Sequence, residues 1–205
     1  MNRISTGIRL LFTGMPLLLL AGCGTTPPTS FYLLTPVEQL QPSDSRDALP
    51  NLVIGVGPIR LSDYLGRPQI VARENVNRLQ IEEFDRWGGT LETNVSWVVA
   101  ENLSTLLGTD SVLSLPWERA ILPAYQVTID IRRLDAGDDS QLDLIAVWGV
   151  LNSDGRELLA IRRTDIQEPI SDSEMGTLVA AQSRALGRMS EEIASAIREL
   201  HSREK

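Results

Sequence analysis

The sequence has only one cysteine and one histidine among its 205 residues. Cys23 therefore cannot form a disulfide within the chain. The single histidine, His201, lies in the charged C-terminal stretch HSREK, where the chain is expected to fray. Ser-His-Asp, Cys-His and ordinary zinc sites cannot be assembled from these residues. The sequence thus predicts no catalytic residue, no metal site and no cofactor.

Acidic clusters are the remaining candidates for chemistry. One contains Glu82, Glu83 and Asp85, and the other contains Asp135, Asp138 and Asp139. The first includes outward positions of a predicted strand and the second lies in a predicted hairpin turn, so both are interpreted as solvated surface. The turn also lacks the ligand order of a calcium loop. A carboxylate hydrolase stays open as an alternative, and it would need an acid pair about 5–10 Å apart lining a cleft.

No stretch has the roughly 20 consecutive apolar residues that a membrane-spanning helix needs. A shorter apolar run follows Arg3 and Arg9 and ends in Leu20-Ala21-Gly22-Cys23. A charged start, a short hydrophobic centre and a small-residue end are typical of a secretory signal peptide. Residues 1–22 are therefore predicted to be a signal peptide that is removed.

The last four residues of this segment resemble a bacterial lipobox, after which cleavage leaves Cys23 at the N-terminus with an acylated thiol. Two or three acyl chains would give stable anchoring, because each buried methylene contributes about 0.8 kcal/mol. Gly24, in place of Asp, matches the sorting pattern of diderm lipoproteins that stay in the outer membrane and face the periplasm. A free or disulfide-bonded cysteine that merely follows an apolar run is the alternative.

The mature chain has few basic residues for its length. Removing residues 1–22 takes away two of the 19 basic residues and none of the 27 acidic ones, so the net charge of −8 becomes −10. This balance makes nucleic acid and anionic headgroups poor partners for the surface as a whole. The remaining 183 residues suit a single domain.

The domain organisation is predicted from two polar, proline-bearing segments, GTTPPTS at 24–30 and QPSDSRDALPN at 41–51. Residues 23–51 are assigned to the lipidated cysteine, a tether and an N-terminal edge strand or docking arm, FYLL. Residues 52–205 are assigned to the folded domain, which is expected to begin near Leu52.

Alternating periodicities predict the fold class. Apolar residues recur at helical spacing from Thr90 to Gly108 and again from about Ser173 onward, which predicts two helices, the second one long. β-branched runs at 52–61, a hairpin within 68–84 and an antiparallel meander from Ala124 predict strands. Together they predict a single two-layer α+β domain in which a mostly antiparallel sheet is covered by two helices.

Residues 56–103 resemble the PqiC/YmbA family of ABC-type transport auxiliary lipoproteins. The resemblance is carried by Y-L-G-R-P-Q-I-V at 64–71 and by Arg86-Trp87. The lipobox, the FYLL strand and the two-helix layout agree with it. One departure is Gly88-Gly89-Thr90-Leu91, where the family usually has Ala-Glu-Pro-Leu, so a polar contact of that Glu is in doubt. Thr90 is expected to cap the helix instead.

The resemblance implies a lipoprotein subunit of a transport system that carries phospholipid or other lipid between membranes and is built around an MCE-domain protein. Such a subunit would receive the end of the MCE assembly at the outer membrane, and docking fits this sequence better than lipid carriage. If the partner is a symmetric ring, several copies would bind it, as a ring of their own. A pilot lipoprotein for an outer-membrane secretion channel is the alternative.

Four residues are the candidate partner-binding site. Tyr64, Arg67, Arg86 and Trp87 are expected to converge at one end of the sheet, and Tyr, Trp and Arg dominate interface energetics. Trp87 is singled out because its neighbours in sequence cannot easily bury it. The alternative is that the stretch only shapes the bend, with Gly66 and Pro68 fixing it.

Overall fold

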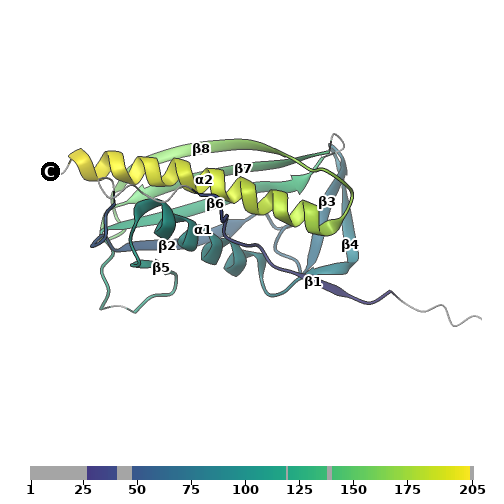
Figure 1. The fold of residues 1–205 in the computed structure, drawn as a ribbon, viewed down its shortest axis with the longest axis horizontal. Helices are drawn as coiled ribbons and strands as arrows, with labels where there is room; N and C mark the ends of the chain where they lie inside the picture. The colour runs from purple at the N-terminus through teal and green to yellow at the C-terminus, as the bar shows by residue number, and fades with distance from the viewer. Residues whose placement is uncertain (1–26, 41–47, 119, 138–139, 204–205) are drawn as a thin grey trace, which may run out of the picture.

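The computed structural model describes residues 27–40, 48–118, 120–137 and 140–203, so the predicted signal peptide and Cys23 lie outside the described residues. Within these ranges the chain forms two helices and eight strands (Figure 1). The helices are α1 (Leu91–Leu107) and α2 (Met175–Arg203). The strands are β1 (Ser30–Tyr32), β2 (Ile54–Leu61), β3 (Gln69–Asn75), β4 (Arg78–Trp87), β5 (Val112–Ser114), β6 (Tyr125–Ala136), β7 (Gln141–Leu151) and β8 (Leu158–Pro169).

A five-stranded sheet in the order β5-β2-β6-β7-β8 carries the core. The meander β6-β7-β8 is antiparallel, as the short turns between its predicted strands indicate. β2 runs parallel to both β5 and β6, because a hairpin and a helix intervene between β2 and β6 and return the chain to the same end of the sheet. The α+β class is therefore confirmed, while the sheet is mixed.

A second, three-stranded sheet in the order β1-β4-β3 forms one end of the molecule. The predicted hairpin is β3-β4, and the predicted FYLL strand is β1, which pairs in parallel with β4 through Ser30–Asp85 and Tyr32–Trp87. In Figure 1 this sheet lies at the opposite end of the long axis from the C-terminus. The expectation of a single sheet is wrong, since these strands form a separate sheet.

Both helices cover the same face of the five-stranded sheet (Figure 1). α1 begins after Thr90, whose hydroxyl accepts a hydrogen bond from Thr93 N, and ends at Gly108, which has a φ of 62°. These caps confirm the predicted boundaries. α2 has 29 residues, which corresponds to about 43 Å, and packs on β6, β7 and β8. No helix of the described ranges is both long and apolar enough to cross a membrane.

Residues 33–40, termed the strap, run from β1 onto the two helices. Leu34 is only 1% exposed. Thr35 N donates to Ser183 Oγ of α2 at 3.2 Å, and Val37 N donates to Asn102 Oδ1 of α1 at 3.1 Å. Leu34 and Leu40 of the strap thus belong to the same hydrophobic core as the helices and the five-stranded sheet.

Candidate functional site

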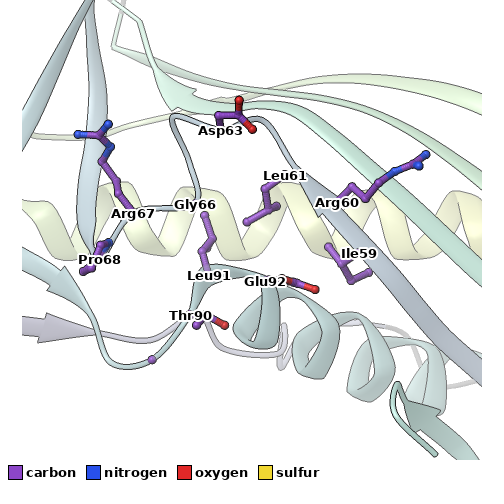
Figure 2. Close-up of a pocket in the computed structure, with 11 residues that line it drawn as sticks. Ile59, Arg60, Leu61, Asp63, Gly66, Arg67, Pro68, Thr90, Leu91 and Glu92 are labelled. Carbon is purple, nitrogen blue, oxygen red and sulfur yellow. The ribbon is translucent and has the colours of Figure 1, made fainter.

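Residues 66–68 of the recognised sequence pattern and the start of α1 line an open cleft of about 590 Å³, termed the motif cleft (Figure 2). One wall is the end of β2 with the bend that follows it, and the other is the start of α1. The lining residues are Ile59, Arg60, Leu61, Asp63, Gly66, Arg67, Pro68, Gly89, Thr90, Leu91 and Glu92.

Backbone hydrogen bonds hold the bend between the two sheets. Ser62 N donates to Ile131 O of β6 at 3.0 Å, and Leu65 N closes the turn on Ser62 O at 2.8 Å. On the other side, Trp87 N at the end of β4 donates to Pro68 O at 2.8 Å. The bend is therefore a fixed wall, and its last residue, Pro68, lies beside Trp87 at the end of β4.

The opposite wall depends on the pair of glycines that departs from the family pattern. Gly89 has a φ of +143°, a conformation that side chains rarely adopt, and it leads directly into the capping residue Thr90. Gly88 N donates to Tyr32 O of β1 at 2.8 Å. This wall of the cleft is thus tied to the strand on which the N-terminal tether enters the fold.

The cleft is lined by apolar side chains and by charges of both signs. Ile59, Leu61 and Leu91 supply the apolar surface. Arg60 and Arg67 supply positive charge, and Asp63 and Glu92 supply negative charge (Figure 2). Such a mixed surface suits a polypeptide segment with its own apolar and charged side chains. In the part of the chain that is described, no group of His, Cys, Asp and Glu could hold a metal ion.

The four residues singled out from the sequence have different environments. Arg67 is half-buried, lines the cleft and donates from Nε to Tyr64 O at 3.2 Å. Arg86 is half-exposed and pairs with Glu83 at 3.7 Å. Trp87 is only 5% exposed, so the expectation that it stays unburied is wrong: it lies in the core beside Tyr32 of β1. Whether these residues bind a partner stays a prediction.

Tyr64 is turned toward a buried carboxylate that the sequence interpretation missed. Its hydroxyl donates to Asp135 Oδ2 at 2.5 Å. Asp135 is fully buried, and its Oδ1 also accepts from Arg73 Nε at 2.9 Å and from Arg133 Nε at 3.0 Å. The interpretation of Asp135 as solvated surface is therefore wrong. The adjacent pair Arg132-Arg133 on the same strand is a signal in the sequence, because neighbouring strand residues point to opposite faces and an inward-facing arginine needs a carboxylate partner.

This network changes the protonation equilibria of its members. Burial raises the pKa of Tyr64 above its ordinary value of 10, and the hydrogen bond to Asp135 raises that pKa further. The hydrogen bond to Asp135 also raises the pKa of Arg73. Asp135 joins β3, β6 and the bend through these contacts, so it positions the cleft wall without lining the cleft itself.

Comparison with known proteins identifies relatives of the whole fold. The family model described as ABC-type transport auxiliary lipoprotein component matches residues 32–194. Protein XCC0632 from Xanthomonas campestris, of the DUF330 family, has a TM-score of 0.69 at 17% identity, covering 86% of this chain and 100% of that chain. A crystal structure titled as an uncharacterized protein has a TM-score of 0.67 at 17% identity, covering 83% and 99%. At such identities the structural likeness shows the fold alone. No curated protein matches the sequence.

Proposed function

Because the chain belongs to the family of ABC-type transport auxiliary lipoprotein components, we propose that it is the outer-membrane lipoprotein of an MCE-type system for intermembrane lipid transport. Cys23 carries the acyl anchor, the domain faces the periplasm, and the domain docks the end of the MCE assembly. The lipobox and Gly24 support the location, and the resemblance at 56–103 supports the partner.

The motif cleft is the observation that carries the docking role. Residues far apart in sequence, 59–68 and 89–92, are brought together there around an open surface. Arg67 is both part of the recognised stretch and exposed to this cleft. Arginine beside apolar surface is the kind of residue that dominates the energetics of protein interfaces. We therefore assign the partner contact to the motif cleft, with Arg67 as its central residue.

The use of the apolar residues supports docking rather than carriage of lipid. The helices and the five-stranded sheet bury their apolar side chains against one another in one core. The motif cleft is open and carries four charged side chains, which an acyl chain would have to desolvate. A symmetric MCE ring would bind several copies of this chain together, each through the same cleft.

Recovery of partners from native membranes tests this function. The tagged, lipidated protein is extracted in mild detergent and the co-purifying proteins are identified by mass spectrometry, for wild type, Arg67→Ala and Arg163→Ala. Arg163 is an exposed arginine of β8 outside the cleft, so it is a matched control. We expect wild type and Arg163→Ala to recover an MCE-domain protein and Arg67→Ala to lose most of it.

Three results would contradict parts of this proposal. Recovery of a secretin in place of an MCE protein would favour the pilot-lipoprotein alternative. Equal recovery by Arg67→Ala and wild type, with unchanged folding, would remove the cleft from the interface. Equal amounts of Cys23→Ala and wild type in the soluble fraction would show that the anchor assignment is wrong.

A further inference from the structure

Exposed apolar side chains gather at the end of the molecule that is formed by β1, β3 and β4, termed the anchor end. Phe31 of β1 is 69% exposed and Leu33, directly after β1, is 57% exposed. Val76, in the turn between β3 and β4, is 84% exposed, and Ile81 and Phe84 of β4 are also exposed. Phe31 pairs with Arg86 of β4, two residues after Phe84, while Val76 lies beyond the other end of β4. Several exposed apolar side chains on one small sheet are a reason to ask what apolar surface this end of the molecule meets.

The distance between Cys23 and this surface is limited by the chain. Six residues separate Cys23 from Ser30, the first residue of β1, so seven Cα–Cα steps join the two. Even a fully extended segment of that length spans at most about 25 Å. The tether therefore cannot carry β1 far from the membrane in which the acyl chains of Cys23 are inserted.

The point at which the tether enters the fold is fixed. β1 pairs with β4, and the strap that follows is hydrogen-bonded to both helices. In Figure 1, β1 extends outward at the end that carries β3 and β4, while the C-terminus lies at the other end. Because α2 alone runs about 43 Å along this axis, the tether is too short for an inverted orientation, in which the C-terminal end would face the membrane and the anchor end would point away from it.

We infer that the anchor end rests on the bilayer that holds Cys23, with Phe31 and Leu33 in contact with lipid. This inference rests on the lipid anchor of the proposed function, and it adds an orientation and a lipid-binding surface to it. Aromatic and aliphatic side chains at such a surface gain by entering the boundary between headgroups and acyl chains.

The charges at the anchor end specify the kind of lipid. Arg78 pairs with Glu74 at 2.8 Å, Arg86 pairs with Glu83, and Arg73 pairs with the buried Asp135. Glu82 and Asp85 of β4 add further negative charge to the same sheet. With its arginines engaged by carboxylates, this surface has no basic patch for anionic headgroups. It therefore fits a zwitterionic bilayer, such as one of phosphatidylethanolamine and phosphatidylcholine.

Depth-dependent fluorescence quenching tests the orientation. Because the Cys23 thiol is acylated in the lipidated protein, a cysteine introduced elsewhere is the only free thiol. The lipidated variants Phe31→Cys and Leu122→Cys are labelled with an environment-sensitive dye and placed in phosphatidylethanolamine/phosphatidylcholine liposomes with brominated acyl chains. Leu122 is 75% exposed and follows β5 in the chain, away from the anchor end, so it is the matched control. Leu33→Cys is a second probe if Phe31→Cys folds poorly.

We expect the dye at residue 31 to be quenched several-fold more strongly than the dye at residue 122. Equal, weak quenching at both positions in protein that floats with the liposomes would overturn the orientation and leave the proposed function intact. Protein that does not float would show that the anchor itself is wrong, and both proposals would lose their premise. If the dye at residue 31 is shielded from water but is not quenched by the brominated acyl chains, then a protein neighbour covers this position. That result would also overturn the contact with lipid.

Discussion

At the scale of single residues, the wall of the motif cleft depends on a carboxylate that never reaches the cleft. Asp135 accepts hydrogen bonds from Tyr64, Arg73 and Arg133, and the guanidinium of Arg73 also lies over the Tyr64 ring at 5.8 Å. A carboxylate with no exposure requires such partners, because burying an unpaired charge is costly. Tyr64 is therefore a positioning residue, and its hydroxyl links the bend to β6.

The raised pKa of Tyr64 gives stability a dependence on alkaline pH. The unfolded tyrosine ionises near pH 10, whereas the folded one keeps its proton to higher pH. Above pH 10 the unfolded state thus binds fewer protons than the native state, so the free energy of unfolding falls as pH rises. We expect Tyr64→Phe to be less stable than wild type at pH 8 and to lose stability less steeply between pH 10 and 11. Urea unfolding at each pH measures both, and parallel curves for the two proteins would contradict the assignment.

Site residues could be predicted from the sequence where their partners lie close to them in the chain, and not where their partners lie far away. Thr90 is predicted correctly as a helix cap, because the cap depends on residues that follow it within one turn. Trp87 is misjudged because a strand some fifty residues earlier in the chain, β1, lies beside it. Asp135 is misjudged because its partners Arg73 and Tyr64 come from distant segments. These two side chains are buried by segments that are distant from them in the sequence.

At the scale of elements, periodicity identifies the strands but not their pairing. The alternation from Tyr125 predicts β6, and the turns that follow predict the antiparallel partners β7 and β8. Alternation is the same in parallel and antiparallel strands, so the parallel pairing of β2 with β6 could not be predicted from it. β5 has only three residues, which is too short for a periodic pattern. The helices were more predictable, because their apolar stripes and caps extend over many residues.

Two glycines of α2 test how the strap is held. A Cβ added at Gly187 would lie 2.6 Å from Val37 Cγ2 of the strap, whereas a Cβ at Gly176 would meet nothing within 4 Å. We expect Gly187→Leu to displace the strap, lower the free energy of unfolding and expose residues 33–40 to protease. The matched variant Gly176→Leu is expected to leave stability unchanged or higher, since leucine favours helix over glycine by roughly 0.5–1 kcal/mol. Similar protease sensitivity in the two variants would show that the close approach is unimportant.

At the scale of the whole molecule, the anchor end and the motif cleft are parts of one arrangement. Tyr32 of β1 pairs with Trp87 and accepts a hydrogen bond from Gly88, and the next residue, Gly89, lines the cleft. The short tether that keeps β1 near the bilayer therefore keeps the cleft near it too. A partner bound in the cleft would end close to the membrane surface, which is where lipid has to be delivered or collected.

Lengthening the tether separates anchoring from orientation. Inserting 20 Gly and Ser residues after Thr26 would raise the maximum reach of the tether from about 25 Å to about 95 Å. The acyl chains are unchanged, so we expect the protein to float with liposomes as before. The effective concentration of the anchor end at the bilayer falls when its linker lengthens, so quenching at Phe31→Cys should decrease.

The same insertion should also reduce recovery of the MCE partner. The motif cleft would no longer be held at the distance from the membrane at which the MCE assembly ends. Appending the same 20 residues to the C-terminus is the control, since that end lies away from β1 (Figure 1). Reduced quenching with full partner recovery would show that the partner finds the cleft without help from the membrane. In that case the orientation at the bilayer would serve lipid contact alone, and docking would depend only on the cleft residues.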